Sequence, residues 1–347
     1  MKKKINIVIT GAGSAVGQGI LKCLSRRKSK LNLIPADVSP LNAGLYFLKK
    51  SILIPKVEQN GSLKKIVWLL KKIKAKGLFV GSEYEIEFFS KNKDFIEKKT
   101  KTKIFISKFK NIKIGNDKYK TYLFLKKNNF LTPDTFELEK RNKKKILKKI
   151  KFPCYVKPKK GTSSRGVFIV KSLKDFHDLK LYNKRYIIQN QAGDRNKKEE
   201  YTAGLFVDKN KKIFGPIILR RIIKNGTSWV SEVIKNKKIS EYLKNVSSKF
   251  NLVGSINFQF YEKKGLPEIF EINPRISGSC PIRAYFGFNE PEMYLDHFLN
   301  YLKIKKPKIK MGMCLRFNQE IFIDNFNFKK VKKNKENKIN AKIKQWF

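Results

Sequence analysis

The residues best suited to phosphate chemistry lie at the end of one apolar segment and in the polar loop that follows it. Lys157 closes the run 152–157, and the loop 159–166 reads Lys-Lys-Gly-Thr-Ser-Ser-Arg-Gly. Its backbone N–H groups, its glycines and the hydroxyls of Ser163 and Ser164 suit phosphate oxygens, while a lysine supplies a point charge. The segment therefore predicts a phosphate site.

The order of elements around this loop distinguishes it from a Walker-type phosphate loop. In a Walker-type loop the chain passes from strand to helix, and the lysine lies inside the glycine pattern. Here Lys157 precedes Gly161 and Gly166, and another apolar strand follows over 167–170. We predict a hairpin that folds over a triphosphate as a flap. The alternative is an ordinary hairpin with a flexible polar tip.

A second group of oxygen-bearing side chains lies on two consecutive predicted strands. Residues 255–261 alternate between apolar and polar, so Gln259 faces away from the core, and the partner strand 268–273 places Glu271 and Asn273 on one face. Carboxylate and amide oxygens are the hard ligands that Mg²⁺ prefers. We therefore predict that Gln259, Glu271 and Asn273 bind Mg²⁺, with Mn²⁺ as a second candidate ion. The alternative is a hairpin whose polar face lies in water.

Several arginines are candidates for contact with anions. Arg275 follows this group by two residues and is placed to stabilise charge on a transferring phosphoryl group. Substrate specificity is predicted to reside in other features, although a surface location explains each nearly as well: Arg220, Arg221, the segment 226–229 and Arg283.

A glycine-rich turn near the start of the chain suggests a dinucleotide site. Gly11, Gly13 and Gly17 lie between an apolar run and an amphipathic stretch, where a helix N-terminus binds anions. Asp37, at the end of the next apolar run, is placed to hold a ribose. The spacing G-x-G-x-x-x-G only approximates the dinucleotide pattern. An NAD(P)-binding oxidoreductase is therefore kept as an alternative, beside glycines that only let helix and strand pack closely.

The elements that must position these residues follow two patterns. Up to about residue 110, apolar runs alternate with amphipathic stretches, which predicts a Rossmann-like, doubly wound parallel sheet. A helix is then predicted from Asp117 to about Lys127, and the short strands beyond it predict antiparallel sheets in an α+β unit. The predicted strands are 154–158, 167–170, 186–189, 202–207, 213–219, 255–261 and 268–272, and the predicted helices are 174–180 and 240–250.

Composition limits the classes of protein to which the chain can belong. Its 347 residues are enough for two or three domains, and no stretch approaches the roughly 20 apolar residues of a membrane span. Four widely spaced cysteines predict neither a zinc site nor a disulfide framework, which favours the cytoplasm. The formal charge of +51 suggests a nucleic acid or another polyanion. Because lysine is spread evenly, we favour compositional drift on solvated faces instead.

The order of these motifs resembles the ATP-grasp superfamily, in particular its members that look like the carbamoyl-phosphate synthase large chain. The motifs are Asp117-Lys118, F-P-x-x-V-K-P with G-x-S-S-x-G-V, the stretch 189–201, and E-I-N-P-R. The resemblance covers roughly residues 5–300. It implies a pre-ATP-grasp domain over 1–115, an ATP-grasp domain over 116–303 with subdomains of about 116–195 and 196–303, and a C-terminal segment, 304–347, with a loosely held basic tail.

The resemblance also implies roles for single residues. Lys118 and Lys157 contact the ATP phosphates, Gly161 to Gly166 covers them, Gln189 and Gln191 lie at the adenine hinge, and Glu200 holds the ribose. Gln259, Glu271 and Asn273 are implied as the magnesium ligands, and Arg275 as the arginine that stabilises phosphate. Two departures concern the hinge: Gln189 stands where the family often has an acid, and 194–198 lengthens the loop before Glu200.

The implied reaction is an ATP-dependent ligation. A substrate carboxylate attacks the γ-phosphate of Mg-ATP, and an amine, or less often a thiol, displaces phosphate from the acyl phosphate. Small-molecule carboxylates and amines are the expected partners, nucleic acid is not expected, and a homodimer is left open. Besides the oxidoreductase, a non-catalytic nucleotide-binding or nucleic-acid-binding protein is the other alternative.

Overall fold

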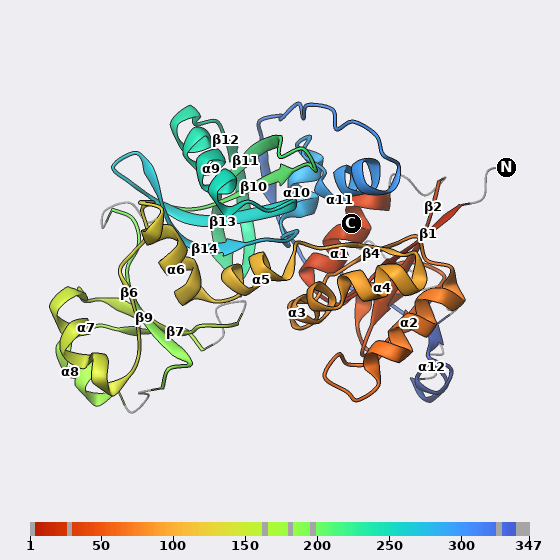
Figure 1. Ribbon diagram of the computed structural model, residues 1–347, viewed down its shortest axis with the longest axis horizontal. Coiled ribbons are helices and arrows are strands. Elements are labelled where there is room, and N and C mark those ends of the chain that lie inside the picture. The colour runs from red at the N-terminus through yellow and green to blue at the C-terminus, as the bar shows by residue number, and fades with distance from the viewer. Residues whose placement is uncertain are drawn as a thin grey trace. The chain divides into compact units, whose positions relative to one another are not determined.

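The computed structural model describes residues 4–25, 30–161, 166–179, 183–194, 199–323 and 328–337 (Figure 1). The chain divides into two compact units. The first contains Met1–Phe109, Ile276–Ile309 and Arg316–Phe347, and the second contains Lys110–Arg275 and Lys310–Leu315. This division differs from the expected domains because the segment after Arg275, expected in the ATP-grasp domain up to residue 303, packs with the first unit.

The first unit is built on a sheet of five parallel strands in the order β3-β2-β1-β4-β5, to which β16 adds an antiparallel edge. The predicted parallel sheet is confirmed. Strand β1 lies at its centre, since it pairs with β2 on one side and with β4 on the other. The strands are β1 (Ile5–Ile9), β2 (Leu31–Asp37), β3 (Ser51–Leu53), β4 (Gly77–Phe79), β5 (Lys103–Phe105) and β16 (Glu336–Asn337).

Helices of the first unit pack in two groups, α1 with α10 and α11, and α4 with α2 and α3. Helices α3 and α4 meet at Asn92. Within the C-terminal segment expected over 304–347, residues 328–334 form a helix, α12. The helices are α1 (Ala15–Leu24), η2 (Ala43–Tyr46), α2 (Ser62–Ile73), α3 (Glu83–Lys91), α4 (Lys93–Thr100), α10 (Cys280–Tyr285), α11 (Glu290–Tyr294), η4 (Leu295–Leu299) and α12 (Phe328–Asn334).

The glycine-rich turn after β1 bonds with its own surroundings. Asp37, the residue proposed to hold a ribose, accepts hydrogen bonds from the backbone N–H of Gly13 at 2.7 Å and from the side-chain amide of Asn42 at 2.6 Å. A Cβ atom at Gly17 would lie 2.2 Å from the carbonyl oxygen of Gly11. The glycines therefore allow close packing of helix on strand, which is the second of the two interpretations of this turn.

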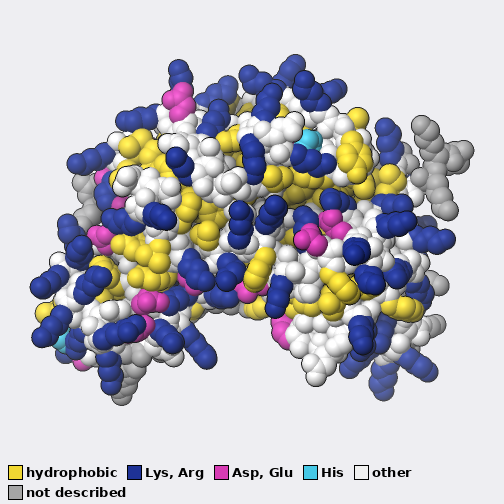
Figure 2. Space-filling model, in the orientation of Figure 1, with side chains coloured by type: hydrophobic (Ala, Val, Ile, Leu, Met, Phe, Trp, Pro, Cys, Tyr) yellow, Lys and Arg dark blue, Asp and Glu magenta, His cyan; other side chains and the backbone are white. Residues whose placement is uncertain are grey.

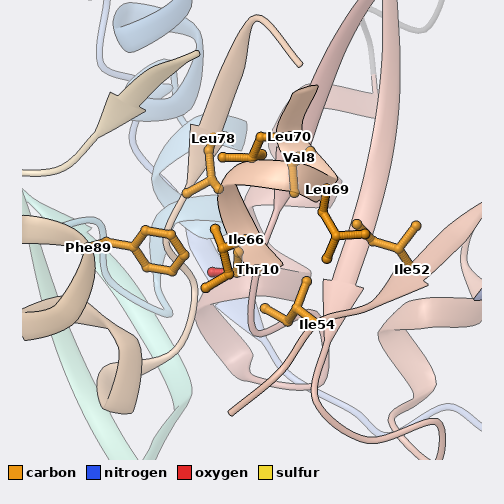
Figure 3. Close-up of a pocket in the computed structure, with 9 residues that line it drawn as sticks. All are labelled: Val8, Thr10, Ile52, Ile54, Ile66, Leu69, Leu70, Leu78 and Phe89. Carbon is orange, nitrogen blue, oxygen red and sulfur yellow. The ribbon is translucent and has the colours of Figure 1, made fainter. Parts of the chain in front are cut away.

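A small cavity lies in the core of the first unit (Figure 3). Its lining comes from strands β1, β3 and β4 and from helices α2 and α3, and it is apolar except for Thr10. Such a lining offers almost no hydrogen-bonding groups to a ligand, so the cavity is a gap in core packing. The lining residues are Val8, Thr10, Ile52, Ile54, Ile66, Leu69, Leu70, Leu78 and Phe89.

The second unit contains two antiparallel sheets, as predicted. A four-stranded sheet has the order β6-β9-β7-β8, and a six-stranded sheet has the order β14-β13-β10-β11-β12-β15. Strands β6, β12 and β15 were not among the predicted elements. The strands are β6 (Thr135–Glu137), β7 (Cys154–Pro158), β8 (Phe168–Val170), β9 (Tyr186–Asn190), β10 (Glu200–Val207), β11 (Ile213–Lys224), β12 (Thr227–Ile234), β13 (Gly254–Lys263), β14 (Leu266–Asn273) and β15 (Met313–Leu315).

One face of the six-stranded sheet forms the main core of the second unit. Phe258 and Phe260 of β13 and Ala203 of β10 pack there with Leu243 and Val246 of α9. Helix α6 begins where predicted because Asp117 caps it, accepting hydrogen bonds from the backbone of Tyr119 and Lys120. The helices are α5 (Phe109–Gly115), α6 (Lys118–Lys127), η3 (Lys140–Asn142), α7 (Lys143–Lys149), α8 (Leu173–Asp178) and α9 (Lys237–Phe250).

Basic side chains are spread over the surface. Figure 2 shows Lys and Arg side chains over all parts of the visible face, with Asp and Glu side chains interspersed. No helix among the described residues is both long enough and apolar enough to span a bilayer. The expectation that nucleic acid is not a partner stays a prediction.

A buried carboxyl group makes the stability of the chain depend on pH. Glu85 lies in the first turn of α3. Burial raises the pKa of Glu85 to about 7, and the negative charges of Asp37 and Glu58 add to the rise, while a hydrogen bond with Thr10 opposes it. Folding therefore favours the protonated form of Glu85.

We expect the variant Glu85→Gln to gain stability over the wild type as pH rises. The contribution of protonated Glu85 is fully present below its unfolded pKa of 4.5 and is lost as pH rises through about 7. The difference in free energy of unfolding between the two chains should therefore grow by about 3 kcal/mol between about pH 4.5 and pH 8, measured by urea unfolding. Glu83→Gln, in the same helical turn, is the control. A difference that is constant with pH would contradict a buried, protonated Glu85.

Candidate active site

The second face of the six-stranded sheet carries a polar cluster on its neighbouring strands β14, β13 and β10. Gln259 lies opposite Glu271 in the register of β13 and β14, and Asn257 lies opposite Asn273. The Oε1 atom of Glu271 accepts hydrogen bonds from Asn273 Nδ2 at 2.8 Å and from Gln259 Nε2 at 3.3 Å. The structure thus brings together the three residues that were predicted to hold a metal ion.

A β-bulge adjusts this cluster. Gln259 pairs with Glu271 but Phe260 pairs with Ile269, so Phe270 is the extra residue on β14. The bulge keeps Ile269 in the core and leaves the Phe270 ring 5.5 Å from Lys157 Nζ. The strict alternation assumed for the sequence 268–273 did not predict it.

Lys157, on β7, is buried beside this cluster. Burial and the nearby charge of Lys118 lower the pKa of Lys157 to about 8, although the carboxylates of Glu271 and Glu200 oppose this effect. Two lysines and a carboxylate therefore lie within electrostatic range of one another. Such a group of charges suits a ligand that carries several negative charges of its own.

Glu271 is ionised in this setting. Burial by itself would raise the pKa of Glu271, but Lys118, the hydrogen bond from Asn273, Lys157 and Arg275 together lower it below the usual value. Arg275 therefore lies near the carboxylate, as predicted from its position after Asn273. Its backbone N–H bonds the carbonyl of Asn273 at 2.8 Å, which forms the turn at the end of β14.

The predicted flap is a hairpin of β7 and β8, and Cys154 pairs with Val170. Gly161 and Gly166 have φ angles of +144° and +69°, which side chains disfavour. The flap base is joined to α6, since Lys118 Nζ donates to the carbonyl of Gly161 at 3.0 Å. Ser163 and Ser164, predicted to bind phosphate, lie outside the described residues.

The two predicted hinge glutamines have different surroundings. Gln189, on β9, is buried, and its amide donates to the hydroxyl of Thr135 at 2.7 Å. Because the partner of Gln189 on β6 is a neutral hydroxyl, an amide at this position takes the place of the acid that the family often has there. Gln191 lies just beyond β9 and is exposed. Contact of either residue with adenine stays a prediction.

Glu200 and Arg221 extend the polar cluster on the same face. Glu200 begins β10 and accepts from Arg221 Nη2 at 2.5 Å and from the Tyr261 hydroxyl at 3.2 Å. Arg221 Nη2 also donates to Gln259 Oε1 at 2.9 Å, and Arg221 Nη1 donates to the Ser228 hydroxyl at 3.2 Å. The cluster therefore spans β14, β13, β10, β11 and β12 without interruption.

Two arginines proposed to face a substrate lie elsewhere. Arg220 precedes Arg221 on β11, so it points to the opposite face of the sheet, where it bonds Glu199 and Glu232. Arg283 is fully buried in the first unit and bonds Glu290 at 3.3 Å. Both expectations were wrong. Arg220 points away from the cluster because successive residues of a strand face opposite sides of the sheet. Arg283 forms a buried ion pair with Glu290 where contact with a ligand was expected. The segment 226–229 consists of the turn residue Gly226 and the first three residues of β12.

Several supporting residues were not predicted from the sequence. Gly115, the last residue of α5, lies against the turn that follows β14, and a Cβ atom there would lie 2.2 Å from Pro274 Cδ. Thr202 donates to Asn257 Oδ1 at 2.8 Å and so orients the amide next to Asn273. A glycine before a charged helix is the only sequence signal that marks Gly115.

The side chains of the cluster fit a magnesium ion by their chemistry. An ionised Glu271 lies beside the amides of Gln259 and Asn273, and carboxylate and amide oxygens are hard ligands. Both amides now turn their nitrogens to Glu271, and rotation about the last side-chain bond would present their oxygens. Among the described residues, no group of three or more His, Cys, Asp and Glu side chains is placed to hold a metal ion.

Comparison with known proteins shows which proteins this chain resembles. A family model described as "ATP-grasp in the biosynthetic pathway with Ter operon" matches residues 197–321. The carbamoyl phosphate synthase large chain of Caldanaerobacter subterraneus subsp. tengcongensis is 26% identical over 202 residues. That match covers 54% of this chain and 18% of the relative, so the chain corresponds to less than a fifth of that protein.

Solved structures extend the similarity over both units. N5-carboxyaminoimidazole synthetase of Staphylococcus aureus, complexed with ADP, has a TM-score of 0.70 at 15% identity, covering 91% of this chain and 83% of that one. The biotin carboxylase domain dimer of Hydrogenobacter thermophilus 2-oxoglutarate carboxylase, with MgADP, ADP and bicarbonate, has a TM-score of 0.70 at 14% identity, covering 90% and 74%. The chain resembles ATP-grasp proteins with a Rossmann-like N-terminal domain, as the motifs predicted.

We expect Gly115→Ala to disturb the turn that carries Asn273 and Arg275. The new methyl group would meet Pro274 Cδ and the carbonyl oxygen of Ile272, and overpacking of this kind costs about 1 to 3 kcal/mol. Urea unfolding measures the loss. The double variant with Pro274→Ala should be less destabilised than the sum of the two single variants. Additive effects would show that Pro274 is not what Gly115 accommodates.

Proposed function

We propose that the protein is an ATP-dependent ligase that activates a carboxylate as an acyl phosphate, for attack by an amine or a thiol, and releases ADP and phosphate. The observation that carries the proposal is the ionised Glu271, bonded to Gln259 and Asn273 and lying within electrostatic range of Lys157 and Lys118. This arrangement provides an anion-binding side and a cation-binding side within one cluster.

The nucleotide would lie in the second unit, between polar residues of its two antiparallel sheets. Lys157 and Lys118 neutralise the phosphates, and the flap glycines Gly161 and Gly166 contribute backbone donors near them. Glu200 accepts from the ribose hydroxyls, and the main chain near Gln189 and Gln191 bonds adenine. The ADP complexes among the similar structures support nucleotide binding at such a fold.

Glu271, with Asn273 and Gln259, would hold Mg²⁺ or Mn²⁺, and the bound ion would supply charge neutralisation for the phosphates. Arg275 lies beside this group and stabilises the charge that develops on the transferring phosphoryl group. No side chain in the cluster is needed as a covalent nucleophile. Orientation and charge neutralisation therefore supply the catalysis.

A carboxylate and an amine are the small-molecule partners, a homodimer is the proposed assembly, and the cytoplasm is the proposed location. Incubation with Mg-ATP and pooled acids and amines, followed by mass spectrometry, tests the reaction class. Products that are amides or thioesters support ligation, whereas nicotinamide fluorescence quenching or salt-sensitive retention on DNA would favour the alternative classes.

We expect the affinity for ATP to fall as pH rises through about 8, because Lys157 loses its charge there. The fall is at most about tenfold per pH unit for one proton. Lys157→Met should weaken ATP binding about 10- to 100-fold, the effect of one charge-assisted hydrogen bond, and should flatten the pH profile. Isothermal titration calorimetry measures both.

Lys159→Met is the matched control for this change. Lys159 lies two residues along from Lys157 and bonds Glu137 on β6. The variant Lys159→Met should therefore leave the pH dependence of ATP binding unchanged. Loss of the pH dependence in Lys159→Met but not in Lys157→Met would contradict the assignment of Lys157.

We expect Glu271→Ala to remove the metal-dependent part of ATP binding and to lower any turnover of Mg-ATP by more than about 100-fold, because the charged member of the metal group is lost. Binding with Mg²⁺ and with a chelator measures this effect, and circular dichroism checks the fold. Glu241→Ala, on the exposed side of α9, is the control. Unchanged turnover in Glu271→Ala would refute the metal assignment.

A further inference from the structure

Arg221 connects two parts of the polar cluster, the proposed ribose site and the proposed metal site. The Arg221 side chain is 9% exposed, and its guanidinium donates to Glu200 Oε1 from Nη2 at 2.5 Å and from Nε at 3.2 Å. The same Nη2 donates to Gln259 Oε1 at 2.9 Å. Glu200 is the proposed ribose acid, and Gln259 belongs to the proposed metal group. Arg221 is therefore the direct link between the nucleotide and the metal groups.

The two bonds of Arg221 differ in strength. Glu200 forms an ion pair with Arg221, and a charge-assisted hydrogen bond is roughly twice as strong as one to a neutral acceptor such as the Gln259 amide. The bond to Glu200 therefore positions the guanidinium, and the bond to Gln259 depends on it. Weakening the first bond should also loosen the second.

The bond to Gln259 decides which end of its amide faces Glu271. With Oε1 held by Arg221, Gln259 directs Nε2 to Glu271 Oε1 at 3.3 Å, beside Asn273 Nδ2 at 2.8 Å. Amide hydrogens then face the carboxylate oxygen that a cation would need. The amide oxygen of Gln259, itself a candidate ligand, is engaged by a positive charge. This arrangement opposes metal binding.

We propose that Arg221 is a positioning residue that makes metal binding depend on occupation of the ribose site. This inference rests on the proposed function. Ribose hydroxyls that donate to Glu200 compete with Arg221 for the same carboxylate, so the guanidinium loosens and releases Gln259. Its amide is then able to turn its oxygen towards Glu271. By linkage, a bound metal ion raises the affinity for the nucleoside by the same factor.

The test uses adenosine, because it carries the ribose but no phosphate that could itself bind metal. Binding of Mn²⁺ alone is measured by electron paramagnetic resonance of the free ion, with and without saturating adenosine. In the wild type we expect adenosine to tighten Mn²⁺ binding about fivefold, the effect of one hydrogen bond of ordinary strength. Equal Mn²⁺ affinity with and without adenosine would overturn the proposal.

Two variants assign the effect to Arg221. In Arg221→Met, Mn²⁺ should bind without adenosine about as tightly as it binds the adenosine-loaded wild type, and adenosine should add nothing. Arg221→Lys keeps a charge for Glu200 but lacks the fork that reaches two acceptors, so it should also lose the coupling while keeping the fold. Coupling that survives in Arg221→Lys would overturn the proposal.

Arg220→Met is the matched control. Arg220 is the next residue on β11 and also loses an ion pair, with Glu199 and Glu232, but on the opposite face of the sheet. It should keep the fivefold coupling. Failure of the wild type to bind ATP at all would refute the proposed function, whereas Mg-ATP binding without adenosine coupling, or without adenosine binding, would refute only the role of Arg221.

Discussion

The ionised carboxylate of Glu271 among partly buried side chains is the constraint on which the second unit depends. A carboxylate in such a place requires nearby positive charge and hydrogen-bond donors, which Lys118, Lys157 and Asn273 provide. Burial also lowers the pKa of Lys157. The free-energy cost of burying charge is therefore shared by the carboxylate and the lysine. An arrangement of this kind gains from a ligand that brings several negative charges and a cation together, as Mg-ATP does.

Each charged group in the cluster comes from a different local structure. Asp117 caps α6 and so sets where Lys118 begins the helix. Lys157 is the penultimate residue of β7, whose pairing with β9 is regular, and Glu271 lies at the β-bulge of β14. The bulge is a departure from ideal structure at the point where function is proposed, and such departures are common near active sites.

In the first unit, a glycine-rich turn serves the packing of helix on strand. This turn resembles a dinucleotide loop, yet Asp37 bonds Gly13 and Asn42, and Gly17 packs directly on the backbone of Gly11. A pattern of glycines indicates only that these positions carry no side chain. Whether the space is filled by a phosphate or by the protein's own backbone depends on neighbours that are distant in the sequence.

Local patterns in the sequence were sufficient for the parallel sheet, the helix after Asp117, the flap strands and the shared face of Gln259, Glu271 and Asn273, because period and capping are properties of neighbouring residues. They did not predict the bulge at Phe270, the burial of Arg283 or the role of Gly115 beside Pro274. These depend on register between strands and on contacts across long stretches of chain. The sequence by itself determined which side chains are available for phosphate and metal chemistry. Only the tertiary structure decided that Arg221 and not Arg220 faces them, because strand pairing sets which partner each arginine meets.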